Sequence, residues 1–145
     1  MSRLHFQPIQ GQARNIMQTI LHTPEIASCR LKDLLVLRLA CEEVVMNIVS
    51  YAYPEGVDGF LDVDIQSVED TDGTGNAPDG RLIVISFEDG GAAFNPLEQE
   101  DPDTTLSWQQ RRIGGLGIFL IRRKVHAVSY DYVNQRNTLT VTLRV

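Results

Sequence analysis

The residues in this sequence that suggest chemistry most directly are Glu43 and Asn47, which stand four positions apart in a stretch rich in apolar residues. In an α-helix, this spacing places both side chains on one side, about 6 Å apart along the axis. The carboxylate could then act as a general base, and the amide oxygen suits a magnesium ion. Because the same spacing is common on solvated helix faces, the pair alone also fits a plain polar stripe.

An acidic residue followed by two glycines forms the second candidate, Asp89-Gly90-Gly91, directly after a strand-like run. Glycine lets a flat ligand approach the backbone closely, because it carries no Cβ atom. The carboxylate could accept a hydrogen bond from an exocyclic amine such as that of adenine. An Asp-Gly turn in a surface loop is the plain alternative.

The third candidate is a glycine-rich run that precedes a helical stretch, and it consists of Ile113, Gly114, Gly115, Leu116 and Gly117. Free backbone amides and the helix dipole favour a bound phosphate at such a place. Between positions 111 and 124 the chain also has five basic residues and no acidic one, although its net charge is −6. A flexible turn before a solvated helix is the alternative, but it explains the glycines less well.

Periodic apolar residues predict the elements that must hold these candidates. Helical spacing predicts a long helix over residues 31–51, which carries Glu43 and Asn47. Two further helices are predicted over residues 11–22 and 118–124. Strand patterns are predicted at residues 4–9, 60–67, 82–87, 127–133 and 138–145.

The order of these elements predicts the fold class. Helices come early, strands come in adjacent pairs, and one helix interrupts the pairs. This order is typical of an α+β fold, here a two-layer α/β sandwich whose mixed, mainly antiparallel sheet is covered on one face by about three helices. A polar segment over residues 97–112 is long enough to predict a functional loop. We expect a single domain over residues 1–145.

Composition excludes several classes of partner. A net charge of −6 and a pI of about 4.9 disfavour binding to nucleic acid, whereas a small nucleotide needs only a local pocket. Cys29 and Cys41 are too far apart for a metal or redox motif and are expected to be reduced thiols. We see no secretory signal, no stretch long enough to span a bilayer and no phosphate-binding P-loop motif. We therefore expect no membrane partner and a cytoplasmic location.

Taken in order, the three candidates resemble the GHKL (Bergerat-fold) ATPase superfamily. The resemblance is closest to its stand-alone anti-sigma-factor branch, the serine kinases of the Rsb type, and it covers about residues 5–145. Its signs are Glu43 and Asn47 within the run from Ala40 to Asn47, Asp89-Gly90-Gly91 with Phe94-Asn95-Pro96, and the run from Ile113 to Ile121. Two positions depart from the pattern, because Ala93 replaces a second glycine and Asn95 replaces a frequent aspartate.

The resemblance implies roles for individual residues. Glu43 matches the catalytic general base, and Asn47 matches the ligand of Mg²⁺. Asp89 matches the acid that binds adenine, and Gly91 matches the glycine that admits the base. Thr138 matches a threonine that helps to bind adenine.

The glycine-rich run matches the lid that covers the phosphates of ATP. Gly115 and Gly117 match its phosphate-contacting glycines, and the nucleotide-binding run also includes Ile113, Gly114 and Leu116.

The resemblance also implies partners. Members of this branch transfer the γ-phosphate of Mg-ATP to a serine of a small antagonist protein of the STAS fold. They also sequester a sigma factor, usually as homodimers. Two alternatives remain open: a catalytically silent ATP-binding module that sequesters a regulator, and an ATP hydrolase.

Overall fold

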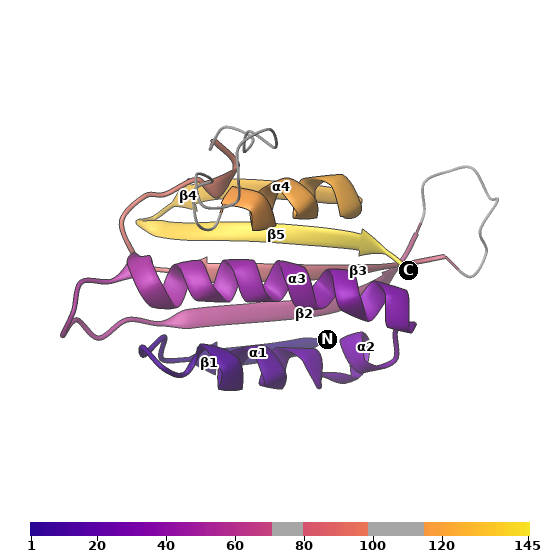
Figure 1. The fold of residues 1–145 in the computed structure, drawn as a ribbon, viewed down its shortest axis with the longest axis horizontal. Coiled ribbons are helices and arrows are strands. Elements are labelled where there is room, and N and C mark those ends of the chain that lie inside the picture. Colours follow the sequence, from indigo (N-terminus) through magenta and orange to yellow (C-terminus); the bar gives the residue numbers. More distant parts are fainter. Residues whose placement is uncertain (71–79, 99–114) are drawn as a thin grey trace.

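An antiparallel sheet forms one layer of the protein (Figure 1). The structure is a computed structural model, and it describes residues 1–70, 80–98 and 115–145. Within these ranges the sheet has five strands in the order β1-β2-β3-β5-β4. The strands are β1 (Ser2–Phe6), β2 (Leu61–Glu69), β3 (Arg81–Asp89), β4 (Ala127–Val133) and β5 (Arg136–Arg144).

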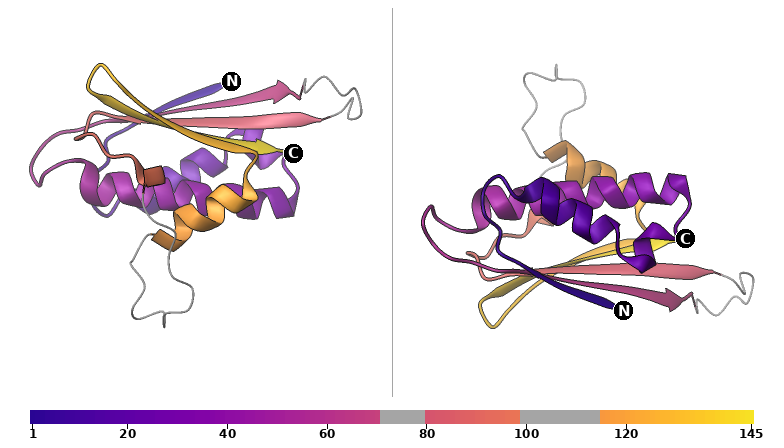
Figure 2. Two further views of the ribbon diagram at one scale, coloured as in Figure 1. Left: turned by 90° about the horizontal axis from the view of Figure 1, so that it is seen from above. Right: turned by 90° about the horizontal axis from the view of Figure 1, so that it is seen from below.

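The helices form the second layer, and both views in Figure 2 show them on the same face of the sheet. They are α1 (Ala13–Leu21), α2 (Pro24–Ala27), α3 (Leu31–Asn47) and α4 (Gly115–Lys124). Two short turns add to them, the π-helical η1 (Ile48–Ala52) and the 3-10 helix η2 (Pro96–Glu98). The predicted α+β fold, a two-layer α/β sandwich, is confirmed.

The core lies between the two layers. Residues of β2, β3 and β5 alternate between buried and half-buried, as expected for strands with one face against helices. Helix α3 lies in the middle of the helical layer, between α1 and α4 (Figure 1). Its buried residues meet those of the strands, and the largest fully buried side chains include Leu37, Val45, Leu61, Ile65, Ile85 and Phe87.

The elements differ from the predictions at several ends. The long helix ends as an α-helix at Asn47 and continues as the π-helical turn η1. The helix predicted over residues 11–22 is α1 and ends at Leu21, and a further short helix, α2, begins at Pro24, because proline suits the first turn of a helix. Every strand pair among the described residues is antiparallel, so the mixed component that we expected is absent there.

Strand register brings distant residues to one edge of the sheet. Asp89 at the end of β3 lies opposite Asn137 at the start of β5. The β4–β5 hairpin turns at Asn134 and Gln135, whose φ angles are 54° and 62°. Positive values at both positions are typical of a tight two-residue turn, which sets the register of β4 against β5. As a result, Tyr130 of β4 also reaches the neighbourhood of Asp89.

No helix in the three described ranges is long and apolar enough to cross a membrane.

Candidate functional site

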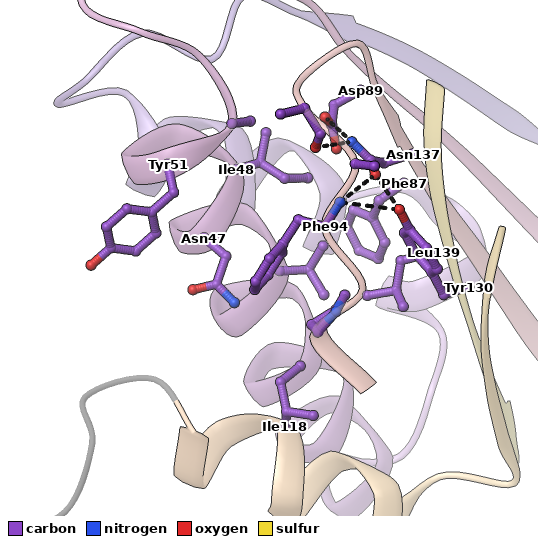
Figure 3. Close-up of a pocket in the computed structure, with 15 residues that line it drawn as sticks. Asn47, Ile48, Tyr51, Phe87, Asp89, Phe94, Ile118, Tyr130, Asn137 and Leu139 are labelled. Atoms are coloured by element: carbon purple, nitrogen blue, oxygen red, sulfur yellow. Dashed lines mark hydrogen bonds between the residues drawn. The ribbon is translucent and has the colours of Figure 1, made fainter. Parts of the chain in front are cut away.

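A cavity of about 500 Å³ opens between the C-terminal end of α3 and the end of the sheet where β3 stops (Figure 3). Apolar side chains form most of its wall, among them Val44, Ile48, Phe87, Ile118 and Leu139. The side chains with polar atoms that line it are those of Asn47, Tyr51, Asp89, Tyr130 and Asn137. A largely apolar wall with a few convergent polar groups is typical of a small-molecule site.

Glu43 and Asn47 lie one helical turn apart on α3, and Asn47 lies at one end of this cavity. The Nδ2 amide of Asn47 donates a hydrogen bond to Oε1 of Glu43 at 3.5 Å. Asn47 lines the cavity, whereas Glu43 is half-buried and is not among the residues that line it. Partial burial raises the pKa of Glu43, and the hydrogen bond from Asn47 opposes that rise. A carboxylate with a raised pKa takes up a proton more readily, as a general base requires.

Asn47 could also bind a cation. Its Nδ2 is used toward Glu43, and no described residue donates to its Oδ1. An amide oxygen beside a carboxylate suits Mg²⁺, which prefers oxygen ligands and usually takes one or two from the protein. The residues present therefore fit a magnesium ion at this end of the cavity.

Gly117 of α4 lies directly against the carboxylate of Glu43. A Cβ atom built on Gly117 would lie 2.2 Å from Oε2 of Glu43, far inside contact distance. With Glu43 in this rotamer, position 117 has no room for a side chain, so a larger residue there would displace the Glu43 carboxylate. Gly115 and Leu116 begin α4, whereas Ile113 and Gly114 lie outside the described residues.

Asp89 lies at the other end of the cavity and is only 6% exposed. Its Oδ1 accepts hydrogen bonds from the Gly91 amide at 2.9 Å and from Nδ2 of Asn137 at 3.1 Å. No described residue donates to its Oδ2, which is therefore left for a ligand. Burial raises the pKa of Asp89, and these two hydrogen bonds oppose the rise. The arrangement suits a ligand that carries an N–H donor.

The backbone after Asp89 is held against η1. A Cβ atom on Gly91 would lie 2.3 Å from the carbonyl oxygen of Ala52, so only glycine fits there. The hydroxyl of Tyr53 accepts a hydrogen bond from the Gly90 amide at 2.7 Å and bonds both backbone groups of Phe60. The hydroxyl of Tyr53 therefore joins the segment that contains Phe60 to the loop that follows Asp89.

Substituting Gly91→Ala should destabilise the fold by about 1–3 kcal/mol, because the new methyl group would overlap rigid backbone. The expected result in thermal unfolding is a midpoint several degrees lower. Gly90→Ala is the matched control, since its Cβ atom would meet side chains rather than backbone, the ring of Phe60 at 2.8 Å and the hydroxyl of Tyr53 at 3.5 Å. Equal midpoints for the Gly91 variant and the unsubstituted protein would contradict the close contact with Ala52.

Thr138 does not line the cavity. It is half-buried on β5 and lies opposite Glu88, and its side chain alternates away from the buried face of the strand. Its neighbour Asn137 lines the cavity instead and is 7% exposed. Sequence reasoning missed Asn137, because its place beside Asp89 depends on the pairing of β3 with β5.

The two departures from the superfamily pattern lie in the loop after Asp89. Ala93 lines the cavity. The Oδ1 of Asn95 accepts a hydrogen bond from the Leu97 amide at 2.9 Å at the start of η2. Because a carboxylate oxygen could accept the same bond, asparagine can replace aspartate here. Arg122 of α4 donates to the Leu97 carbonyl at 3.1 Å and ties η2 to that helix.

The cysteines take no part in the cavity. Cys29 and Cys41 are both free thiols, in line with the expected reduced state. Complete burial raises the pKa of Cys41 to about 12, so this thiol is inert at neutral pH. In the described ranges, no group of three or more histidine, cysteine, aspartate or glutamate side chains could hold a metal ion.

Comparison with known proteins agrees with this geometry. The sequence profile of the histidine kinase-like ATPase domain matches residues 6–143. A serine/threonine-protein kinase named BtrW, from Bordetella bronchiseptica, is 29% identical over 106 residues, which span 73% of this chain and 67% of that protein.

Proposed function

Since the chain belongs to the histidine kinase-like ATPase domain family, we propose that it is an ATP-dependent serine-protein kinase, formed by one domain over residues 1–145. The observation that carries the proposal is the packing of Glu43 against Gly117 and against Asn47, which lines one end of a cavity whose other end holds Asp89. A module that only binds a nucleotide has no need of a half-buried carboxylate at that place. The similarity to a protein named as a serine/threonine kinase supports the same reading.

In this proposal, different residues bind different parts of the nucleotide. Asp89 accepts a hydrogen bond from the exocyclic amine of adenine, and the loop after it, which begins with Gly91, supports the base. Asn47 holds Mg²⁺, which neutralises phosphate charge when it is bound. Gly115 and Gly117, at the start of α4, lie where the helix dipole favours phosphate oxygens.

The proposed reaction requires a proton acceptor. A serine hydroxyl of the partner protein attacks the γ-phosphorus, a new O–P bond forms, and the bond to the β-phosphate oxygen breaks to release ADP. The hydroxyl proton passes to the carboxylate of Glu43. Phosphoryl transfer depends mainly on positioning and charge neutralisation, so the rigid setting of Glu43 beside Asn47 and Gly117 supports the assignment.

We further propose that the serine belongs to a STAS-type antagonist and that the protein sequesters a sigma factor as a cytoplasmic homodimer. The support is the resemblance of the three motifs to the anti-sigma-factor branch, together with the similarity to a protein named as a serine/threonine kinase. The acidic charge of the chain supports a protein partner over a nucleic acid.

The destination of the γ-phosphate tests the proposed reaction. We expect that incubation with γ-labelled Mg-ATP and a panel of STAS-domain proteins from the same organism will label a serine on one of them. Gel separation followed by peptide mapping measures this. Label that collects as free phosphate regardless of partner would indicate an ATP hydrolase. Label that stays on ATP would indicate a catalytically silent binding module.

A further inference from the structure

Asn137 is the centre of a hydrogen-bond network at the Asp89 end of the cavity (Figure 3). Its Nδ2 donates to Oδ1 of Asp89 at 3.1 Å, to the Gly91 carbonyl at 3.2 Å and to the Ala92 carbonyl at 3.0 Å. One buried amide thus connects the end of β3 to the loop that follows it.

The oxygen of the same amide is used as well. Oδ1 of Asn137 accepts hydrogen bonds from the Phe94 amide at 3.1 Å and from the hydroxyl of Tyr130. That hydroxyl in turn accepts a bond from the Phe94 amide at 3.2 Å. The Phe94 amide therefore fixes the orientation of the Asn137 side chain, because a backbone N–H can only donate and must face the amide oxygen. The Tyr130 hydroxyl adds a second hydrogen bond to the same oxygen.

The network uses every hydrogen-bonding group of the Asn137 side chain, so none remains free to bind a ligand. Its two amide protons face three acceptors, and its oxygen has two donors. Asp89 differs, since all its bonds from described residues reach Oδ1 and none reaches Oδ2. Although Asn137 lines the cavity, its polar atoms are all used within the protein, so its hydrogen bonds act on a bound nucleotide through Asp89 and the loop from Gly91 to Phe94.

We infer that Asn137 is a positioning residue that sets the base selectivity of the site. It holds Asp89 in one orientation, with Oδ2 as a fixed acceptor, and it holds the loop from Gly91 to Phe94 beside it. A fixed acceptor favours a base with an exocyclic amine and repels a base with a carbonyl oxygen at that position. This inference rests on the proposed binding of ATP, and the Tyr130 hydroxyl adds one hydrogen bond that helps to hold the Asn137 amide.

The residue type at position 137 follows from this role. The position needs a donor toward Asp89 and an acceptor toward Phe94 and Tyr130, and an asparagine amide supplies both. An aspartate would keep the acceptor but would place a second carboxylate against Asp89, where like charges repel. A side chain without polar atoms would remove five hydrogen bonds, and it would leave the Gly91 and Ala92 carbonyls without the donor that Asn137 supplies.

The test compares ATP with inosine triphosphate, which has a carbonyl oxygen where adenine has its amine. Dissociation constants are measured by calorimetry with Mg²⁺, and tripolyphosphate serves as a probe without a base. For Asn137→Ala we expect the affinity for ATP to fall by about tenfold or more, toward that of Asp89→Asn. We expect the affinities for inosine triphosphate and tripolyphosphate to change little, so the preference for ATP collapses.

Two further variants separate positioning from general damage. In Asn137→Asp, a proton shared between the two carboxylates would restore a donor toward Asp89. We therefore expect the affinity of this variant for ATP to recover as the pH falls. The double variant Asn137→Ala with Asp89→Asn is a separate check, and its loss of ATP affinity should be no larger than that of either single change. Tyr130→Phe keeps the ring and removes the hydroxyl, and it should lower the affinity for ATP by a few-fold, a smaller loss of the same kind.

The outcomes are distinct. If Asn137→Ala lowered the affinity for ATP, inosine triphosphate and tripolyphosphate equally, Asn137 would be a general structural residue and the inference would be wrong. Unchanged affinity for ATP in a folded Asn137→Ala variant would also overturn the inference. If the unsubstituted protein bound ATP and inosine triphosphate equally, selectivity would not reside in this network. If it bound neither, the proposed function would fail first and the inference with it.

Discussion

Replacing Glu43 with glutamine is expected to slow phosphoryl transfer to serine by roughly 10²–10⁴-fold while ATP affinity changes by less than about threefold. Glutamine keeps the length of the side chain, so it fits beside Gly117 and can still accept the bond from Asn47. It cannot accept the proton of the attacking hydroxyl. Single-turnover transfer of labelled phosphate gives the rate, and calorimetry gives the affinity.

Glu42→Gln is the matched control, because Glu42 is the neighbouring carboxylate and is exposed. It should transfer phosphate at nearly the unsubstituted rate. A Glu43→Gln variant with full transfer activity would exclude Glu43 as the base.

The pH profile of transfer provides a second check on the same residue. Because burial raises the pKa of Glu43, its carboxylate is lost at a higher pH than that of an exposed glutamate. The rate should therefore decline as the pH falls through this raised pKa and recover as the pH rises again. Glu43→Gln should show a low rate without this decline, and an unchanged decline would assign it to another group.

Replacing Asp89 with asparagine is expected to weaken ATP binding by roughly 10- to 100-fold, the effect of losing a charged hydrogen-bond acceptor worth about 1.5–3 kcal/mol. The variant keeps the shape of the side chain but lacks the negative charge that an adenine amine would meet. Calorimetric titration with Mg-ATP measures the change.

Glu88→Gln is the control for Asp89. It changes the adjacent carboxylate, which lies on the other face of β3 and pairs with Arg136. Its affinity for ATP should stay within about twofold of the unsubstituted value, since it lies outside the cavity wall. Equal affinities for Asp89→Asn and the unsubstituted protein would remove Asp89 from the adenine site.

Local pattern was enough to predict most of the elements. Helix α3 has a full set of apolar residues at helical spacing, so its start and the shared face of Glu43 and Asn47 could be predicted. The hairpin of β4 and β5 was also predictable, because its strands are adjacent and joined by a short turn. The four residues of α2 were missed, since so short a helix has little periodic signal.

The cavity itself depends on contacts between distant segments, which local patterns do not encode. Asn137 reaches Asp89 only because β5 pairs with β3 across 48 positions of sequence. Gly117 could be predicted as a lid glycine by resemblance, but its closeness to Glu43 requires α4 to cross α3. Likewise, the hydroxyl of Tyr53 joins Phe60 and Gly90 only after the loops have folded together.

The central claim is that the cavity between Asn47 and Asp89 binds ATP. Thermal unfolding with and without Mg-ATP tests this claim most directly. A ligand at a hundred times its dissociation constant should add about 2.7 kcal/mol of stability. For a chain of this length, that corresponds to a rise in the midpoint of roughly 5–10 °C. We predict such a rise for the unsubstituted protein and a much smaller one for Asp89→Asn. A folded protein whose midpoint does not move with Mg-ATP would contradict the account.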